Sequence, residues 1–576
     1  MDLLQQFVDF MTTNVVEKGI NVGGENIPYM VILLLGTGLY LTLRTGFVQL
    51  RRLGHGFAVT SGRYDDPNEP GDVSHFQALT TALSATVGIG NIAGVAIAIH
   101  LGGPGALFWM WVTAFLGMAT KYSEVTLAQQ YREVNNAGGA RWEGAVSGGP
   151  MYYIEKGLGP KWKWMAVFFA AMLGFTAFLT GNAVQANTVA DNVEAVWGIP
   201  VWITGLVTAG LVGAVILGGI SRIGRVTSIL APMMAALYVT GALIIIFLHL
   251  DQLVPALSLI FHEAFNPSAG VAGTGVGVFV ITMMWGVRRG LFSNEAGQGS
   301  APIAHAAAKT DEPVSEGVVA LLEPFIDTIL ICSMTGVVII MTGMYHDRIP
   351  TEITLSGGDL SYTTLTEGGR YVSMDPPSEI RLQNGMEVEE GVGAPLVSWH
   401  ETAIDTLYVD QAQTIPFSGI VYPERGDATS DDGQSYTSLW GNAPESGAPL
   451  TMEAFQRGLP GNWGHFIVLI SAILFAVSTA ISWSYYGDRC ANYLFGHGAV
   501  LPYKIVYVIM HYMGAVVPLA VVWAMGDVAL SIVIIPNLVA LIFLAPKVVE
   551  LTRSYFERRP WEENARVHAE WKRTRE

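Results

Sequence analysis

Apolar stretches, each about as long as one bilayer crossing, recur along almost the whole chain. A helix crosses the hydrocarbon core in about 20 residues, so each stretch predicts a membrane-spanning helix. Eleven such stretches cover residues 30–49, 77–100, 105–130, 163–188, 201–220, 226–249, 275–304, 317–344, 463–486, 503–524 and 527–546. The pattern predicts an all-α, polytopic membrane protein.

Two of these stretches contain a glycine-bearing interruption, at Ser84–Gly94 and at Gly290–Gly297. Both interruptions contain the sequence Asn-x-Ala-Gly. Backbone polar groups inside a bilayer must be paired unless they line a cavity or bind something. Matched interruptions in the two halves of a membrane protein are the best sequence indication of a transporter's substrate site. We therefore expect two broken helices that meet near the middle of the membrane.

The spans fall into two groups of five, which lie in residues 77–250 and in residues 275–344 plus 463–546. An odd number of spans inverts the second group relative to the first, so the pattern predicts a 5+5 inverted repeat. Residues 1–76 precede these groups and hold the first span. In that segment, residues 1–29 resemble a short amphipathic helix at the membrane interface.

The distribution of Lys and Arg predicts the orientation, because these residues are enriched in cytoplasmic loops. They are concentrated after the first span, between spans three and four, five and six, and nine and ten, and in the tail 547–576. The loops 189–200 and 250–274 contain neither residue. We expect the plasma (inner) membrane, with the N-terminus outside and the C-terminus in the cytoplasm.

One polar insert, residues 345–460, interrupts the second group of spans. It contains 18 Asp or Glu against 5 Arg and no Lys, so about -13 of the net charge of -17 lies here. The runs 362–366 and 415–422 favour strands, which predicts a small β-rich domain. The predicted orientation makes the insert extracytoplasmic. It is interpreted either as a solvated cap without chemistry or as a lid that binds a partner or gates access.

The first interruption offers possible binding sites for both an anion and a cation. Free N–H groups at the start of its second half-helix suit a carboxylate, and free carbonyls at the end of its first half-helix suit a cation. The candidate N–H groups are those of Ile89, Gly90 and Asn91, and the candidate carbonyls are those of Ser84 and Val87. Gly88 and Gly90 supply the backbone freedom that the interruption needs. Thr86 and Asn91 add side-chain oxygens. The alternative is close helix packing through small residues.

The second interruption places Asn294 and Glu295 within an apolar span. An intramembrane carboxylate is functional by default, so Glu295 is expected to bind a cation, to carry a proton or to pair with Arg288 or Arg289. A purely structural ion pair is the alternative. Phe292 is expected either to wall a small cavity or simply to pack.

Further polar groups lie in two other apolar spans. Ser478 and Ser482 share one helix face next to Thr479, and hydroxyl oxygens suit a hard cation such as sodium. Hydroxyls in membrane helices also bond to their own preceding turn, which is the alternative. Gln185 is expected to hydrogen-bond either a substrate or a neighbouring helix.

The sequence contains no phosphate-binding Gly-Lys-Ser/Thr loop, no HExxH and no CxxC motif. It therefore predicts neither an enzyme nor an ATP-driven pump. Coupling to an ion gradient is the energy source for transport that remains.

Four motifs resemble the alanine or glycine:cation symporter family. They are residues 82–94, residues 148–154 (Gly-Gly-Pro-Met-Tyr-Tyr-Ile), residues 290–299 and residues 483–487 (Trp-Ser-Tyr-Tyr-Gly). The resemblance implies eleven helices, the leucine-transporter type of inverted-repeat fold, and Na+- or H+-coupled uptake of alanine or glycine. The insert at 345–460 departs from the short loop usual in that family.

Carried onto this chain, the resemblance also implies a set of site residues. The sodium ligands would be Ser84, Val87, Phe475, Ser478 and Thr479, and the carboxylate seat would be the amides of Ile89 and Gly90. Together with the residues argued above, the candidate substrate contacts are Thr86, Gly88, Ile89, Gly90, Asn91, Gln185, Phe292, Ser293, Asn294, Glu295 and Trp483.

The resulting hypothesis is symport of a small neutral amino acid with sodium by alternating access. The alternatives are proton coupling through Glu295 and, in a different class, a channel or a membrane-embedded sensor. The expected partners are the amino acid, sodium and the lipid bilayer, without nucleic acid.

Overall fold

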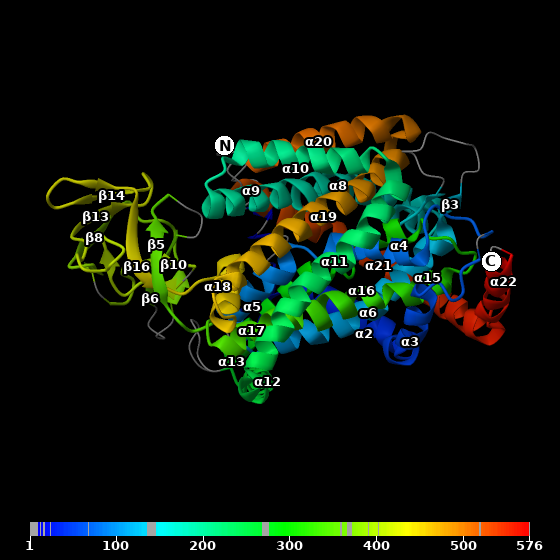
Figure 1. The fold of residues 1–576 in the computed structure, drawn as a ribbon, viewed down its shortest axis with the longest axis horizontal. Coiled ribbons are helices and arrows are strands. Elements are labelled where there is room, and N and C mark those ends of the chain that lie inside the picture. The colour runs from blue at the N-terminus through cyan, green and yellow to red at the C-terminus, as the bar shows by residue number, and fades with distance from the viewer. Residues whose placement is uncertain are drawn as a thin grey trace.

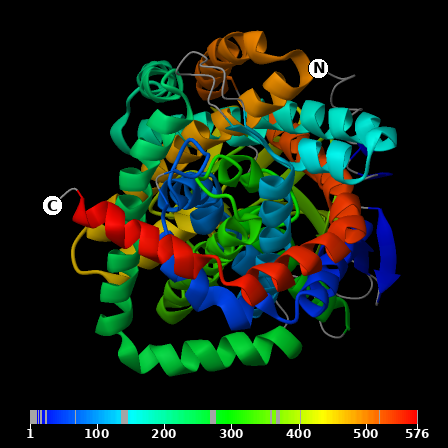
Figure 2. The ribbon, with the colours of Figure 1, turned by 90° about the vertical axis from the view of Figure 1, so that its right-hand side faces the viewer.

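The computed structural model describes residues 10–574 apart from 12, 15–17, 23–24, 67, 135–145, 268–275, 357–359, 366–370, 390, 401 and 518–519. A large helical body forms most of the molecule, and a smaller group of strands extends from one end of it (Figure 1). The C-terminal helix lies across the opposite end (Figure 2).

The helical body is built from α-helices of very different lengths. The α-helices are α2 (Tyr29–Arg44), α3 (Val48–Thr60), α4 (His75–Thr86), α5 (Val95–Gly102), α6 (Ala106–Tyr131), α7 (Pro150–Tyr152), α8 (Lys163–Phe178), α9 (Val184–Trp197), α10 (Val201–Ile216), α11 (Gly219–Leu248), α12 (Leu250–Phe265), α13 (Val276–Asn294), α14 (Ala301–His305), α15 (Pro313–Ala320), α16 (Leu322–Pro324), α17 (Ser333–Thr342), α18 (Gly447–Gly458), α19 (Trp463–Phe495), α20 (Val500–Val516), α21 (Ala520–Arg558) and α22 (Trp561–Arg573).

Short turns of other helix types interrupt or join these α-helices. The π-helical turns are η2 (Gly90–Gly94), η3 (Tyr153–Gly157), η5 (Leu179–Ala183) and η6 (Phe325–Cys332), and the 3₁₀ turns are η4 (Pro160–Trp162) and η7 (His497–Ala499).

Helices occupy most of the described residues of each predicted span, but not all of these helices are long and apolar enough to cross a membrane. Within the described residues six helical stretches meet that requirement, and two bent pairs raise the number to eight. The bent pairs are α2 with α3, at 78°, and His75–Thr86 with Gly90–Gly102, at 55°. The count of eleven spans and the inverted repeat stay predictions.

The β-rich character expected for the insert is present. The strands of the insert are β5 (Ile349–Thr354), β6 (Leu360–Leu365), β7 (Tyr371–Ser373), β8 (Ile380–Gln383), β9 (Met386–Glu387), β10 (Pro395–Trp399), β11 (Thr402–Ala403), β12 (Leu407–Tyr408), β13 (Gly419–Tyr422), β14 (Asp427–Ser430), β15 (Ser435–Tyr436) and β16 (Ser438–Ala443). They form three antiparallel sheets in the orders β11-β10-β6-β7, β12-β16-β5 and β15-β14-β13-β8-β9. Buried apolar side chains such as Leu382, Phe417 and Leu439 give these sheets a core of their own.

Three connecting segments contain structure that the sequence analysis did not predict. The last part of the predicted insert is the helix α18, which packs against α17, α19 and η2 in the helical body. The predicted loop 250–274 contains α12, whose exposed face carries Val254, Phe261 and Phe265. Its apolar period was overlooked because the stretch is shorter than a membrane span.

The third is the N-terminal segment, for which an amphipathic helix was expected; residues 10–11 are helical, and the rest of that helix stays a prediction. Within it, β1 (Gly19–Val22) and β2 (Glu25–Pro28) form a hairpin, while residues 1–9 lie outside the described residues. A second short pair joins β3 (Glu133–Val134) to β4 (Val146–Ser147).

The first broken helix begins at a well-defined cap. The Ser74 hydroxyl accepts a hydrogen bond from the Gln77 N–H at 3.2 Å, and the Gln77 side chain accepts one from the Ser74 N–H at 3.1 Å. This reciprocal capping box satisfies two of the N–H groups that a helix start leaves unpaired. The cap therefore fixes the position at which α4 starts, twelve residues before its break.

Candidate functional site

Both predicted helix breaks are present, and the second lies a few residues later than the sequence suggested. α4 ends at Thr86, Val87 and Gly88 are not helical, and helical structure resumes at Ile89, directly before η2. α13 continues through Asn294, after which Glu295 and Gly297 take the left-handed φ values of 54° and 91°. Gly290–Ser293 are therefore helical. Gly290 is explained by close packing on α6, since a Cβ there would lie 3.2 Å from the Met110 Cα.

A small buried cavity lies between the two breaks. Its volume is about 20 Å³, and it is lined by Ala85, Thr86, Gly88, Ile89, Gly90, Thr180, Gln185, Phe292, Glu295, Thr479, Trp483 and Leu530. The sequence prediction named most of these residues, and it missed Ala85, Thr180 and Leu530. Five separate parts of the chain thus meet at this cavity in the helical body. A cavity of this size has room for about one water molecule, so its walls must separate before a larger molecule enters.

The candidate sodium ligands converge on the end of α4. The Ser84 carbonyl accepts hydrogen bonds from Ser478 Oγ at 3.3 Å and from Thr479 Oγ1 at 3.1 Å. Ser478 Oγ also lies 2.9 Å from the Phe475 carbonyl. Val87 is buried at the C-cap of the same helix. Hydroxyl and carbonyl oxygens from α4 and α19 therefore face one another, which is the ligand chemistry that a hard cation requires.

Two buried oxygens beside the cavity are without a hydrogen-bond partner in the part of the chain that the structure describes. They are Thr180 Oγ1 and Gln185 Oε1. The Gln185 amide nitrogen donates to the Thr180 carbonyl at 3.2 Å, so the two residues lie together. An unsatisfied buried acceptor costs free energy, and a ligand with N–H donors can relieve that cost.

Glu295 forms another part of the wall. Its carboxylate accepts hydrogen bonds from Ser300 Oγ and, at 3.2 Å, from Trp483 Nε1. The Trp483 ring is seated against Gly181, where a Cβ would come within 2.4 Å of the indole. The carboxylate and the indole are therefore held in fixed positions at one side of the cavity.

Three of the predicted substrate residues do not line the cavity. Asn91, Ser293 and Asn294 lie behind it, where they join the two breaks to η6. The Asn91 amide donates to Asp327 Oδ1 at 2.6 Å, and the Ser293 hydroxyl donates to Asp327 Oδ2 at 2.7 Å. Asn294 donates to Thr328 Oγ1 at 3.3 Å. These side chains hold the two breaks in register, so they are better described as positioning residues.

Asp327 is the central residue that the sequence interpretation missed. It is a fully buried carboxylate in the span 317–344, and that fact alone marks it as an unusual residue for a membrane helix. Its three side-chain donors are Asn91, Ser293 and Thr328. The presence of an Asp within a predicted membrane span was therefore the sequence signal that could have identified this residue.

A chain of buried ionisable side chains lies beyond the second break. His75 contacts Glu316, Glu316 contacts His305, and His305 contacts Glu323. Lys121 Nζ then lies 2.9 Å from Glu323 Oε2. The array ties α4 and α6 to α14, α15 and α16, so it holds the first half-helix against the elements that follow the second break.

Broken helices that enclose a buried polar cavity between them define the class of membrane transporters. The comparisons with known proteins agree. The model of the sodium:alanine symporter family matches residues 10–368 and 387–569. The sodium/alanine symporter AgcS of Methanococcus maripaludis is 39% identical over 532 residues, which cover 92% of this chain and 94% of that protein. A putative sodium/proton-dependent alanine carrier of Bacillus subtilis, YrbD, is 32% identical over 91% of this chain and 89% of that protein.

The chain belongs to the sodium:alanine symporter family. It is therefore a multi-pass membrane transporter and not an enzyme, and its family assigns it to amino-acid and cation symport. Among solved structures, the crystal structure of MhsT in complex with L-phenylalanine is similar with a TM-score of 0.45 at 11% identity, over 84% of this chain and 99% of that one.

Proposed function

We propose that this protein takes up a small neutral amino acid, with alanine and glycine as the leading substrates, together with sodium. Transport follows alternating access between two inverted five-helix repeats, 77–250 and 275–344 plus 463–546. The N-terminus is placed outside and the C-terminus in the cytoplasm. The observation that carries the proposal is the meeting of the two helix breaks at one buried cavity.

The two ends of an amino acid match different groups in the wall of this cavity. The main chain of Ile89 and Gly90 lies at the start of η2, where the positive end of a helix dipole suits a carboxylate. The unpartnered oxygens of Thr180 and Gln185 and the carboxylate of Glu295 suit an ammonium group. The small volume and the aromatic walls favour a short side chain.

Sodium is assigned to the oxygens of Ser84, Val87, Phe475, Ser478 and Thr479. Thr479 also lines the cavity, so the sodium site and the substrate site share a wall. Binding of sodium at this place fixes the end of α4 and thereby orders the amides that receive the substrate carboxylate. Because such coupling is reciprocal, the amino acid raises the affinity for sodium by the same factor.

The direct test is uptake of labelled alanine into proteoliposomes that contain the purified protein. Uptake is expected to require an inward sodium gradient and to be reduced by an excess of unlabelled glycine. Uptake that proceeds equally with choline in place of sodium would refute sodium coupling. Single-channel currents, or binding without any uptake, would instead indicate a channel or a sensor.

Proton coupling is the second candidate, because Glu295 is a buried carboxylate in the cavity wall. A Glu295→Gln variant separates the two. If sodium is the coupling ion, the variant keeps sodium-dependent uptake, with altered substrate affinity. If the proton is the coupling ion, the variant loses alanine-driven proton movement, measured with a pH-sensitive dye inside the vesicles.

A further inference from the structure

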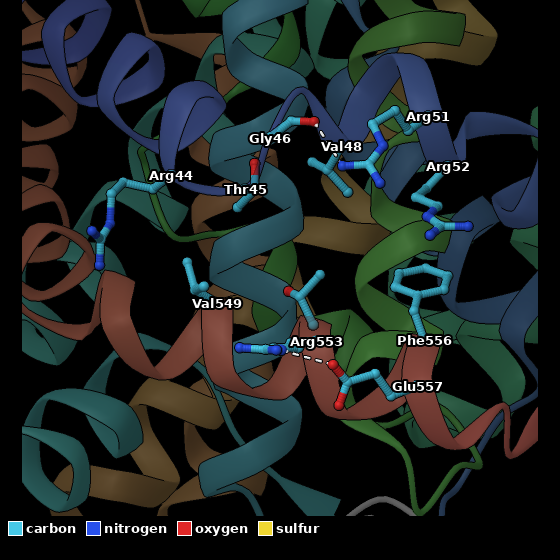
Figure 3. Close-up of a pocket in the computed structure, with 11 residues that line it drawn as sticks. Arg44, Thr45, Gly46, Val48, Arg51, Arg52, Val549, Arg553, Phe556 and Glu557 are labelled. Atoms are coloured by element: carbon cyan, nitrogen blue, oxygen red, sulfur yellow. Dashed lines mark hydrogen bonds and ion pairs between the residues drawn. The ribbon is translucent and has the colours of Figure 1, made fainter.

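A second, much larger pocket lies at the surface of the helical body, where α2 bends into α3 beside the C-terminal part of α21 (Figure 3). Its volume is about 480 Å³, within the usual range for a ligand pocket. It is lined by Arg44, Thr45, Gly46, Val48, Arg51, Arg52, Val549, Thr552, Arg553, Phe556 and Glu557. The proposed transport cycle uses none of these residues.

The lining is strongly basic. Four of its residues are arginines, which come from the end of α2, the start of α3 and α21. One carboxylate offsets them, because Arg553 Nε lies 2.7 Å from Glu557 Oε1. Within the described part of the chain, no carboxylate is paired with Arg44, Arg51 or Arg52. Three positive charges are thus left over for an outside anion.

The main chain adds to the positive potential at this place. α3 begins at Val48 after Phe47, which takes a left-handed φ of 57°. Gly46 and Val48 both line the pocket, so the pocket lies at the positive end of the α3 dipole. Arg52 is held over the Phe556 ring at 3.7 Å from its centre, which fixes its direction. The pocket therefore combines a helix N-terminus with oriented guanidinium groups.

The apolar surface of the neighbouring helices indicates the depth of the pocket in the membrane. Leu39 and Leu43 are exposed on α2 directly before Arg44, and Phe543 is exposed on α21 before Val549. Beyond the bend, Leu50 is exposed on α3. The pocket lies where surfaces suited to acyl chains end, which is the level of lipid headgroups.

We propose that this pocket binds the phosphate-bearing headgroup of an anionic phospholipid. Guanidinium groups pair bidentately with phosphate oxygens, and basic pockets between membrane helices on the cytoplasmic side suit such headgroups. The exposed leucines of α2 and α3 receive the acyl chains. Free phosphate offers the same charged group but no chains, so it would forgo this apolar contact.

The test measures how much lipid the full-length purified protein retains, by native mass spectrometry after titration with phosphatidylglycerol or phosphatidylcholine. The variant is Arg44→Gln/Arg51→Gln/Arg52→Gln. The matched control is Arg222→Gln/Arg225→Gln, which removes two arginines from the first turns of α11, outside the pocket and at an end predicted to be cytoplasmic. Melting temperatures of all proteins show whether each variant is folded.

The native protein and the control are expected to retain phosphatidylglycerol in preference to phosphatidylcholine. The triple variant is expected to lose affinity for phosphatidylglycerol by about 100-fold, on the basis of roughly fivefold for each basic residue. An Arg51→Lys/Arg52→Lys variant keeps the charge but loses the bidentate geometry, so its loss of affinity should be smaller than that of the triple variant.

Two results would overturn the proposal. One is equal retention of phosphatidylglycerol by the native protein and the triple variant, or an equal loss in the control. The other is complete displacement of the lipid by millimolar inorganic phosphate, which would make a soluble phosphate the ligand.

Discussion

At the scale of single residues, the site depends on backbone oxygens that a helix end leaves over. α4 stops at Thr86, so the Ser84 carbonyl is without the partner that a continuing helix would supply. The hydroxyls of Ser478 and Thr479 on α19 approach that carbonyl. This buried polar contact forms because α4 ends beside α19, which continues as a regular helix.

Removal of the Thr479 hydroxyl is expected to weaken sodium binding. In a Thr479→Ala variant, the sodium concentration for half-maximal alanine uptake should rise about fivefold, which corresponds to about 1 kcal/mol for one polar contact. The matched control is Ser484→Ala, because Ser484 lies on the same helix and bonds to its own preceding turn at 2.6 Å. An equal rise in both variants would contradict the assignment of Thr479 as a sodium ligand.

A substitution at Gly88 tests the role of the Thr479 hydroxyl in a second way. A Cβ at Gly88 would lie 2.9 Å from Thr479 Oγ1, so a Gly88→Ala variant must push the hydroxyl away from Ser84. We expect sodium-dependent uptake to be lost while the protein still folds, as judged by its melting temperature. Gly36→Ala on α2 is the control, since a Cβ there meets nothing within 4 Å. Normal uptake by the Gly88→Ala variant would mean that this hydroxyl is not needed.

At the scale of elements, π-helical turns shape the site. η2 follows the first break, η5 carries Thr180, and η6 carries Asp327. A π turn widens a helix and changes the direction of its side chains, and such turns occur often at functional sites. Asp327 is thereby brought into contact with residues of both breaks.

Loss of the Asp327 carboxylate is expected to loosen the junction of the two breaks. In an Asp327→Asn variant one acceptor oxygen becomes an N–H₂ group that faces other donors. We expect destabilisation by about 1–3 kcal/mol, seen as a lower melting temperature, and reduced uptake. Asp191→Asn, at an exposed position on α9, should change neither. An unchanged melting temperature for Asp327→Asn would show that Asp327 does not hold the breaks together.

The contact between the loop before α4 and the C-terminal helix α22 should depend on pH. Burial raises the pKa of the Glu69 carboxyl to about 7, and Glu69 accepts a hydrogen bond from Asn564 on α22 at 3.2 Å. A raised pKa means that the protonated form is favoured in the folded state, so stability present at low pH is lost as the pH rises through about 7.

Hydrogen exchange of α22 measures this effect. Exchange, corrected for its intrinsic pH dependence, is expected to increase between about pH 5 and pH 7 and to level off above pH 7 in the native protein, and to stay constant in Glu69→Gln. The same increase in the variant would assign the effect to another group.

The helical architecture and the first break were predictable because their signals are local. Length, apolarity and a glycine-bearing motif such as Ser84–Gly94 are all visible within one segment. The positions of Thr180 and Asp327 were not predictable, since they depend on π turns that leave no clear mark in the apolar pattern. The partner of Lys121 was also missed, because Glu323 comes close to it only through the packing of α16 against α6.

At the scale of the whole molecule, the acidic insert and the transport site are connected. The sheets stand at one end of the helical body (Figure 1), and the helix α18 that ends the insert reaches the first break. Thr451 Oγ1 donates to the Ile92 carbonyl at 3.0 Å, and His100 Nε2 lies 3.0 Å from the His400 carbonyl. The first broken helix therefore contacts the insert directly.

The central claim is that the two helix breaks bind the amino acid and the cation as one unit. The most direct measurement is equilibrium binding of labelled alanine to the purified protein, with sodium and with choline at the same ionic strength. We predict that sodium raises the affinity for alanine, that alanine raises the affinity for sodium by the same factor, and that Thr479→Ala diminishes both effects. An alanine affinity that is the same in sodium and in choline would contradict the account.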